Sequence, residues 1–312
     1  QTMERHKMSR LIVVSNRVSI PKARGAAGAQ GGLAVALGSA LKERRGIWFG
    51  WSGKETANYT GDINMQKNQG VTTATIDLEQ QDVDEYYNGY ANRTLWPLFH
   101  YRIDLAEYET GFGKGYERVN QRFADSLGPL IEPEDMVWVH DYHLIPLGER
   151  LRTRGNKNRI GFFLHIPWPP RNLLVALPFH ERLVTTMLAY DLIGFQDEES
   201  VDSFLGYCRK ELQAEIGDDG TVTYDGRSVK VAAFPIVDRL DYSKGLPERF
   251  DSLGRFFDTY PDRVKQTLYV QIAPPSRQDV SSYQRIRNTL EQKAGQINGE
   301  RSEVDMVPIR YV

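Results

Sequence analysis

Short apolar runs alternate with longer amphipathic stretches along most of the chain. Each run is rich in Val, Ile and Leu, which is typical of a buried strand in a parallel sheet. The stretches between them carry apolar residues at helical spacing, so the pattern predicts an α/β fold with helices on both faces of a parallel sheet. The expected strands are 11–14, 46–51, 71–78, 136–140, 160–164 and 192–195, and the expected helices are 33–42, 82–95, 116–127, 143–153, 173–190 and 198–212.

The pattern changes at about residue 217 and then starts again. The turn-rich stretch 217–226 predicts a hairpin, and Pro235 follows it. After this proline, alternating helices and strands indicate the beginning of a second α/β domain. We therefore expect an N-terminal domain over 1–236 and a partial second domain over 237–312. The expected elements of this region are strands 221–224, 229–234, 267–272 and 306–311 and helices 247–260 and 281–297.

Composition narrows the class of protein. The 312 residues include 39 Lys and Arg against 41 Asp and Glu, a net charge of −2 that argues against a nucleic-acid coat or a polybasic membrane surface. The single cysteine, Cys208, excludes an internal disulfide and a multi-cysteine zinc site. The sequence contains no stretch of eighteen apolar residues, so we expect no membrane-spanning helix. The polar start, 1–10, does not resemble a signal peptide, so we expect a cytoplasmic protein.

Polar residues that follow the predicted strands are the first candidates for chemistry. Arg17 comes at the end of the first strand, and a glycine-rich stretch with the pair Gly31 and Gly32 follows it. Ligands bind beyond the carboxyl ends of strands in open α/β sheets, and glycines at the start of a helix let the backbone approach a phosphate. The spacing is neither G-x-G-x-x-G nor that of a P-loop, and a flexible loop is the alternative.

Two histidine-containing segments follow other strands. In His140-Asp141-Tyr142-His143 the two imidazoles and the carboxylate could suggest a metal, but zinc prefers three or four convergent ligands. Asp141 is better explained as an acceptor for sugar hydroxyls, or as a cap of the next helix. His165 stands in a proline-rich turn that would hold it rigidly, although a lone histidine is more often structural.

Cations near predicted helix starts and strand ends complete the set. Arg239 and Lys244 precede the helix at 247–260, where they would form a diphosphate clamp. Arg277 follows the strand at 267–272. The alternative for each of them is a surface ion pair of little energetic value.

The helix at 82–95 contains two further features. Asp82-Val83-Asp84 looks like a metal-binding D-x-D motif, but acidic residues at a helix start are explained by the helix dipole. Tyr87 and Trp96 are nine residues apart, which places them on opposite faces of a straight α-helix. We expect them to share a pocket only if the helix ends or bends before Trp96, as Pro97 would allow.

Together these segments resemble the trehalose-6-phosphate synthase family. The resemblance runs from about residue 9 to 312, in family order, and several long motifs in register are far more specific than any one of them. The matching segments are LIVVSNR at 11–17, GGLAV at 31–35, WFGWSG at 48–53, Glu85–Tyr87 with LWPLFHY at 95–101, VHDYHLIP at 139–146, GFFLHIP at 161–167, DRLDYSKGLPERF at 238–250 and QIAPPSRQD at 271–279.

The resemblance implies a GT-B fold, in which two Rossmann-like domains face a cleft, the second one incomplete here. It implies a retaining hexosyltransferase that needs no metal and no cofactor. This enzyme would transfer glucose from UDP-glucose, or another nucleoside-diphosphate glucose, to glucose 6-phosphate, giving α,α-trehalose 6-phosphate and UDP. Its partners would be these two small molecules and further copies of itself in a homo-oligomer, with neither nucleic acid nor membrane.

The resemblance also implies roles for single residues. The acceptor glucose 6-phosphate would be bound by Arg17, Tyr87, Trp96, Asp141 and Arg277. The donor UDP-glucose would be bound by Gly31, Gly32, His165, Arg239 and Lys244. Of these, His165, Asp141, Arg239 and Lys244 would carry catalysis. The cations Arg239 and Lys244 would stabilise the charge that develops on the leaving diphosphate.

The sequence departs from the family pattern in two places. Ile236 joins Val237 directly, where the family normally has an interdomain segment, and the acidic D-G-M-N-L-V-x-K-E motif of the donor site does not occur. We expect the intact protein to have both, and the 312 residues alone to be inactive. A relative with another phosphorylated acceptor, such as glycerol 3-phosphate, and a non-catalytic sugar-phosphate sensor are the alternative functions.

Overall fold

The structure is a computed structural model with two compact units. It describes residues 10–18, 41, 46–68, 71–234, 246–261, 269–271, 281–301 and 309–311. The first unit ends at Pro235, and the second includes Ile236 to Val312. The predicted helix at 33–42 lies, except for Leu41, outside the described residues. None of the described helices is both long and apolar enough to cross a membrane.

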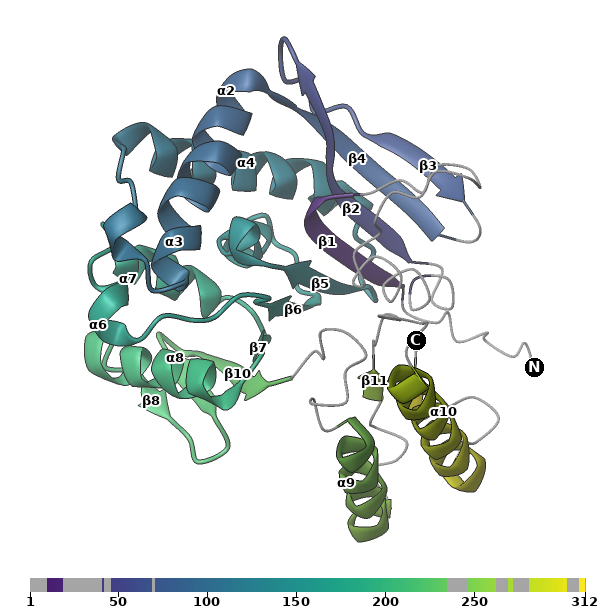
Figure 1. The fold of residues 1–312 in the computed structure, drawn as a ribbon. Helices are drawn as coiled ribbons and strands as arrows, with labels where there is room; N and C mark the ends of the chain where they lie inside the picture. The colour runs from purple at the N-terminus through teal and green to yellow at the C-terminus, as the bar shows by residue number, and fades with distance from the viewer. Residues whose placement is uncertain are drawn as a thin grey trace, which may run out of the picture. The chain divides into compact units, whose positions relative to one another are not determined.

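A ten-stranded sheet forms the framework of the first unit (Figure 1). Its order is β3-β4-β2-β1-β5-β6-β7-β10-β9-β8, and the strands from β4 to β10 in this order are parallel. The strands that pair antiparallel, β3, β9 and β8, lie toward the two edges. The bounds are β1 Leu11–Arg17, β2 Ile47–Thr56, β3 Asn64–Asn68, β4 Val71–Glu79, β5 Met136–His140, β6 Arg159–Phe163, β7 Leu192–Phe195, β8 Glu215–Ile216, β9 Thr221–Tyr224 and β10 Arg227–Ala233.

Helices cover this sheet and bury its central strands. Residues 12–15 of β1 are all buried, as expected for a parallel strand covered on both faces. The apolar side of α4 packs on the sheet, where Phe123 meets Phe49 edge to face at 5.6 Å. The bounds are α2 Gln80–Asp82, the π-helix η1 Val83–Leu95, α3 Trp96–Phe99, the 3₁₀-helices η2 Ile103–Leu105, η3 Gly128–Leu130 and η4 Tyr142–Leu144, α4 Thr110–Leu127, α5 Leu147–Thr153, α6 Arg171–Leu174, α7 His180–Met187 and α8 Glu198–Glu211.

The predicted strands are confirmed where the structure describes them, which is 269–271 and 309–311 for the last two, whereas two predicted helices are divided. The expected helix at 173–190 consists of α6 and α7, because Pro178 and the left-handed Phe179 (φ 59°) interrupt it. The expected helix at 143–153 starts as the 3₁₀-helix η4 and becomes α-helical only after Pro146. The sequence pattern also missed β3, which is mainly polar because it lies at the edge of the sheet.

The predicted helix at 82–95 is for the most part a π-helix, which continues directly into α3 (Figure 1). Nine residues are about two and a half turns of α-helix. In a π-helix each N–H reaches the carbonyl five residues back, so the turn is wider and nine residues make roughly two turns. The expected end or bend before Trp96 takes the form of a change of helix type, because η1 ends at Leu95 and the backbone stays helical at Trp96 (φ −55°, ψ −55°). The wider turn itself brings Tyr87 and Trp96 onto one side.

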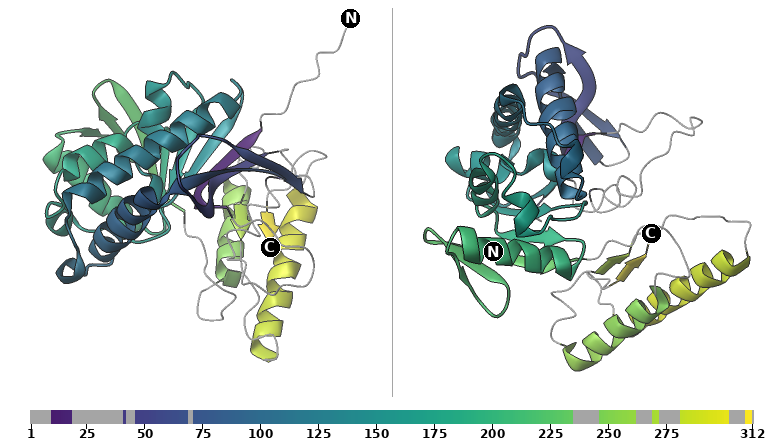
Figure 2. Two further views of the ribbon diagram at one scale, coloured as in Figure 1. Left: turned by 90° about the horizontal axis from the view of Figure 1, so that it is seen from above. Right: turned by 60° about the vertical axis from the view of Figure 1, so that its left-hand side comes forward.

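The second unit has its own small core. Its strands, β11 Tyr269–Gln271 and β12 Ile309–Tyr311, pair parallel, and the helices α9 Leu246–Thr259 and α10 Ser281–Arg301 lie side by side (Figure 2). Phe250 and Phe257 of α9 are buried with Leu290 and Ile297 of α10 and Ile309 of β12. The elements agree with the strand–helix pattern read from the sequence.

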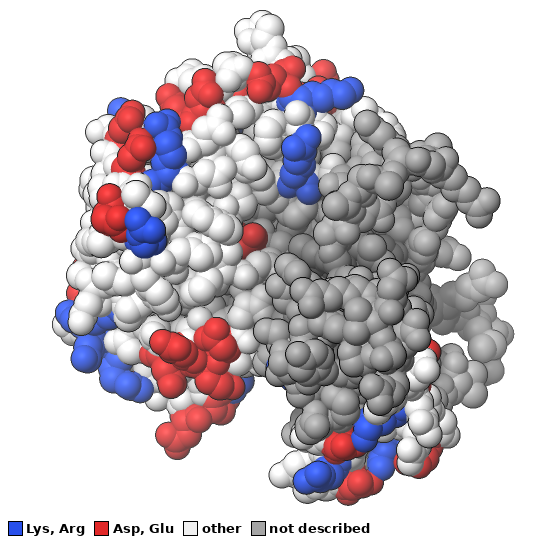
Figure 3. All heavy atoms as spheres, viewed as in Figure 1, with Lys and Arg blue, Asp and Glu red and all other residues white. Residues whose placement is uncertain are grey.

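The face of the molecule in Figure 3 carries described side chains of both charges, including a group of Asp and Glu at its lower left. On the face in Figure 3, Lys and Arg lie singly or beside Asp and Glu, and the described residues form no broad basic patch there. This arrangement fits the near-zero net charge of −2. It offers no extended surface for a polyanion on that face.

Candidate active site

The candidate site lies where the strand order reverses in the main sheet. From β1, the strands β2 and β4 follow on one side, and β5, β6 and β7 follow on the other. Ligands bind beyond the carboxyl ends of the strands at such a switch point. Arg17 ends β1 and His140 ends the adjacent β5, so predicted site residues flank this point.

Arg17 is an exposed cation that residues of β2 hold in place. Its guanidinium lies 5.7 Å from the centre of the Trp51 ring, a cation–π contact. The backbone of Gly53 (φ +84°) comes so close that a Cβ atom would lie 2.4 Å from Nε and Nη2 of Arg17. Among the described residues, no carboxylate forms an ion pair with Arg17. Its charge is therefore available to an anionic ligand.

Replacing Gly53 with Ala is expected to displace the Arg17 guanidinium and to weaken acceptor binding. The matched control is Gly155→Ala, because Gly155 also has a positive φ (+95°) but nothing within 4 Å of the added methyl group. Both variants carry the backbone strain of alanine at positive φ, of order 1–2 kcal/mol. Only Gly53→Ala should raise the KM for the phosphorylated acceptor, by about tenfold or more. Equal KM values in the two variants would show that Gly53 does not govern Arg17.

Asp141 follows β5 in a conformation that favours glycine (φ 76°, ψ 165°). Its N–H donates to the Phe163 carbonyl at 2.8 Å, and its carboxylate accepts from the His165 N–H at 3.3 Å, so both ends are held against β6. Its side chain does not cap the following helix η4, which removes the capping alternative. Burial raises the pKa of Asp141 to about 6. Above that pH the residue is a fixed carboxylate at the switch point.

Tyr87 and Trp96 both lie against the segment after Asp141. The Tyr87 ring stacks on His143 with centroids 5.8 Å apart, and the Trp96 ring lies 5.7 Å from that of Tyr142. Trp51 links this group to Arg17, because its ring is 5.7 Å from Tyr87. Trp96 remains 44% exposed. The structure therefore brings four predicted acceptor residues to one end of the sheet: Arg17, Tyr87, Trp96 and Asp141.

The histidines of the two predicted segments lie in the interior. Nδ1 of the buried His140 is 2.9 Å from Nε2 of the half-buried His165. His143 is buried among aromatic rings, and this burial lowers its pKa to about 3. In the part of the chain that the structure describes, no three His, Cys, Asp or Glu side chains are grouped to hold a metal ion.

Asp82, the first residue of the D-x-D motif, has a structural role. It is completely buried and pairs with Arg118 (2.8 Å) and Arg122 of α4. These ion pairs, and not the helix dipole alone, explain an acidic residue at this position. Asp84 accepts hydrogen bonds from Gln80 and Asn88 on its own helix.

The remaining predicted site residues lie outside the described residues. They are Gly31, Gly32, Arg239, Lys244 and Arg277.

Comparison with known protein families shows to which family this chain belongs. The model of glycosyltransferase family 20 matches residues 9–237 and 236–312. The chain belongs to glycosyltransferase family 20.

Proteins of family 20 are similar to this chain over nearly its whole length. The trehalose-6-phosphate synthase of Sinorhizobium fredii is 42% identical and aligns with 98% of this chain and 74% of its own length. The Burkholderia xenovorans synthase solved in complex with glucose-6-phosphate has a TM-score of 0.67 at 41% identity, over 97% of this chain and 74% of that one. The E. coli protein bound with UDP-2-fluoro glucose has a TM-score of 0.67 at 40% identity, over 97% and 73%. The predicted family and its GT-B fold class are confirmed.

The match to family 20 is interrupted at one position. Its two pieces meet at residues 236–237. The alignment with the Sinorhizobium fredii protein has 342 positions, 30 more than the 312 residues of this chain. Relative to the family, the chain therefore lacks internal residues, and the position of the break is the junction of Ile236 and Val237.

Further residues shape the site: Ser15 and Asn16 stand beside Arg17 in the LIVVSNR segment that the sequence singled out, whereas Trp48, Trp51 and Gly53 received no single role from it. Ser15 accepts from Trp48 Nε1 at 2.8 Å and fixes the end of β1, while Asn16 accepts from the Tyr86 hydroxyl at 2.8 Å and ties β1 to the π-helix. Trp48, Trp51 and Gly53 all belong to the WFGWSG segment, which the family resemblance had already marked. That segment was the available signal for them.

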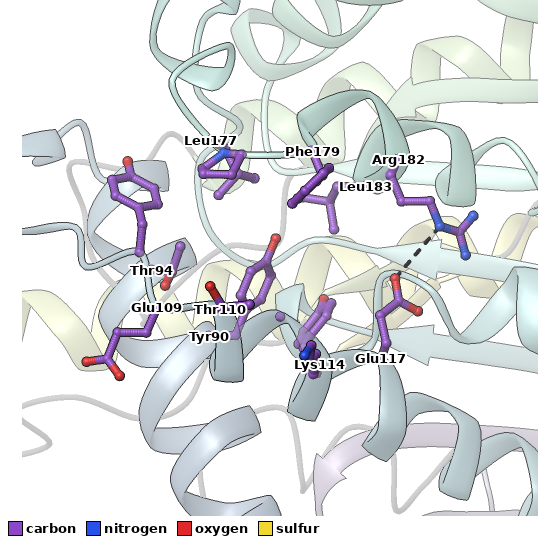
Figure 4. A pocket seen from close by; sticks show the side chains of 14 residues that line it. Tyr90, Thr94, Glu109, Thr110, Lys114, Glu117, Leu177, Phe179, Arg182 and Leu183 are labelled. Atoms are coloured by element: carbon purple, nitrogen blue, oxygen red, sulfur yellow. Dashed lines mark ion pairs between the residues drawn. The ribbon is translucent and has the colours of Figure 1, made fainter.

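A separate cavity of about 630 Å³ lies between η1, the start of α4 and the turn before α7. Figure 4 shows Tyr90, Phe179 and Leu183 pointing into it. No predicted site residue lines this cavity. The ring of Tyr116 does, and its hydroxyl donates to the Tyr142 carbonyl at 2.5 Å, so the cavity wall is hydrogen-bonded to the segment beside Asp141.

Proposed function

We propose that this chain is part of a trehalose-6-phosphate synthase. It transfers glucose from UDP-glucose to glucose 6-phosphate with retention and releases UDP and α,α-trehalose 6-phosphate. The observation that carries the proposal is the grouping of Arg17, which has no carboxylate partner among the described residues, with Asp141 and the rings of Tyr87 and Trp96 at one end of the sheet. A cation, a carboxylate and aromatic faces at one switch point suit a sugar phosphate. Relatives of this name were solved with glucose-6-phosphate and with UDP-2-fluoro glucose.

The residues divide the work between acceptor and donor. Arg17 and Arg277 bind the acceptor phosphate, Tyr87 and Trp96 enclose the hexose, and Asp141 accepts from its hydroxyls. On the donor side, Gly31 and Gly32 let the backbone approach the nucleotide sugar, and His165 contacts the glucosyl group. Arg239 and Lys244 bind the diphosphate and stabilise the charge that grows on it as the glycosidic bond breaks.

The deciding experiment measures UDP release by the intact protein. UDP-glucose is supplied with glucose 6-phosphate, with glycerol 3-phosphate or with no acceptor. We expect turnover with glucose 6-phosphate and an α,α-linked product by NMR. Turnover only with glycerol 3-phosphate would assign the chain to another acceptor. Tight binding of glucose 6-phosphate without turnover would favour the sensor function.

Replacing Lys244 with Ala is expected to weaken the binding of UDP about tenfold or more, because part of the diphosphate charge is then uncompensated. Titration calorimetry with UDP measures the effect, and Lys67→Ala, at an exposed position on β3, is the control. Unchanged affinity in Lys244→Ala would identify Lys244 as an ordinary surface charge.

Three properties of the protein belong to the same proposal: its oligomeric state, its location and its independence of a metal or cofactor. We expect the protein to be a homo-oligomer in the cytoplasm that works without a metal or cofactor. Light scattering measures the oligomeric state. Turnover in the presence of a strong chelator tests the independence of a metal, and loss of activity there would contradict it.

A further inference from the structure

His140 is a buried neighbour of the proposed donor-site residue His165. It is the last residue of β5, is only 1% exposed, and packs its ring on Trp138 at 4.4 Å and on His165 at 5.2 Å. The two imidazoles are nearly parallel, at 22°, and Nδ1 of His140 lies 2.9 Å from Nε2 of His165. One of these nitrogens must donate and the other must accept.

Both imidazoles are neutral near pH 7. Burial lowers the pKa of His165 to about 4, and burial together with the neighbouring His165 lowers the pKa of His140 well below its ordinary value. A neutral imidazole has one N–H and one lone pair in the ring plane. The pair therefore shares a single hydrogen bond, whose direction sets the tautomer of both rings.

The surroundings of His140 select this direction. Its Nε2 is buried and has no hydrogen-bond partner among the described residues. A proton on Nε2 would be an unpaired buried N–H, which is rarer and more costly than an unpaired acceptor. The proton therefore belongs on Nδ1, which donates to Nε2 of His165.

This direction determines what His165 presents to a ligand. Because its Nε2 accepts from His140, His165 carries its own proton on Nδ1. That nitrogen has no partner among the described residues, and the side chain is half-buried at the carboxyl end of the sheet. His165 is thus a fixed donor, which suits a hydroxyl oxygen of a sugar.

We propose that His140 is a positioning residue that locks His165 in the Nδ1–H tautomer, so that His165 donates to a hydroxyl of the donor glucosyl group. The identity of the ligand rests on the proposed function. The assignment of the tautomer does not, because it follows from contacts within the protein alone. His140 acts through His165 and need not contact the substrate.

The first test reads the tautomer directly in the intact protein without substrate. Two-dimensional ¹H–¹⁵N NMR of ¹⁵N-histidine distinguishes Nδ1–H from Nε2–H, and the His165→Gln variant assigns the signal. We expect His165 as Nδ1–H. A proton on Nε2 of His165 would overturn the inference, whatever the activity of the protein.

The second test compares His140→Asn with His140→Leu. The amide of Asn can replace the donating Nδ1, whereas Leu refills the buried space but cannot donate. We expect His140→Leu to raise the KM for UDP-glucose about tenfold without changing the Kd of free UDP. In His140→Asn the KM for UDP-glucose should stay close to that of the unmodified protein. A merely structural role predicts the opposite ranking, because Leu packs better than Asn in an apolar site. Absence of glucosyl transfer in the unmodified protein would refute the proposed function and leave the NMR result standing.

Discussion

Arg17→Ala is expected to raise the KM for glucose 6-phosphate by about thirty-fold to several hundred-fold. The guanidinium lies at the switch point without a carboxylate partner among the residues that the structure describes, held by the Trp51 ring and by the close approach of Gly53. Losing a charge-assisted contact to a phosphate costs on the order of 2–4 kcal/mol. Steady-state kinetics with varied acceptor measures the change. The affinity for UDP should stay constant, because Arg17 is proposed to bind the acceptor phosphate and not the diphosphate of the donor.

The control for this prediction is Arg159→Ala. Arg159 is exposed at the opposite, amino-terminal end of β6, so its removal changes the net charge equally without touching the site. If both variants had a similar KM for glucose 6-phosphate, Arg17 would not bind the acceptor. Thermal unfolding of both proteins shows whether a loss of stability contributes.

Asp141→Asn is expected to abolish most of the activity and to stabilise the protein at neutral pH. Burial raises the pKa of Asp141 to about 6, so between about pH 4 and 6 the folded state binds a proton that the unfolded state has released. The free energy of unfolding of the unmodified protein therefore falls as the pH rises through this window. Above the window the loss has reached its full size. Asn has no charge to bury, and it tolerates a positive φ better than most residues.

Urea unfolding at pH 4 and pH 7.5 tests this expectation. We expect a gain in the free energy of unfolding of order 1–3 kcal/mol for Asp141→Asn at pH 7.5, and no gain at pH 4. Turnover should fall at least a hundred-fold, both at an acceptor concentration below the KM and at one above it. Asp202→Asn removes an exposed carboxylate from α8 and should change neither quantity. A less stable Asp141→Asn protein at pH 7.5 would show that the carboxylate is compensated by its hydrogen bonds.

The sequence predicts the strands well because each is a short β-branched run between polar breaks, and β1 and β5 are good examples. It also places Arg17 and Asp141 at the site, because residues that follow adjacent parallel strands meet at one edge. Contacts between distant segments are not encoded in such patterns. The approach of Gly53 to Arg17 and the His140–His165 pair appear only once the sheet is assembled.

The type of helix at 83–95 could not be predicted from the sequence either. Apolar spacing predicts an amphipathic helix at 82–95, but it does not distinguish the hydrogen-bond pattern of a π-helix from that of an α-helix. Tertiary contacts that local spacing does not encode hold this helix, including the hydrogen bond from the Tyr86 hydroxyl to Asn16 and that from the Tyr142 hydroxyl to Asn92.

The π-helix also makes the site depend on the number of residues in the chain. In an ordinary helix each residue turns the chain by about 100°, so one deletion rotates everything beyond it by more than a quarter turn. Within 83–95 a deletion would also allow the segment to close into the narrower and more stable α-helical form. Trp96 would then turn away from Tyr87 although no functional residue had been substituted. Insertions and deletions in this stretch are thus more damaging to the site than conservative substitutions on its exposed side.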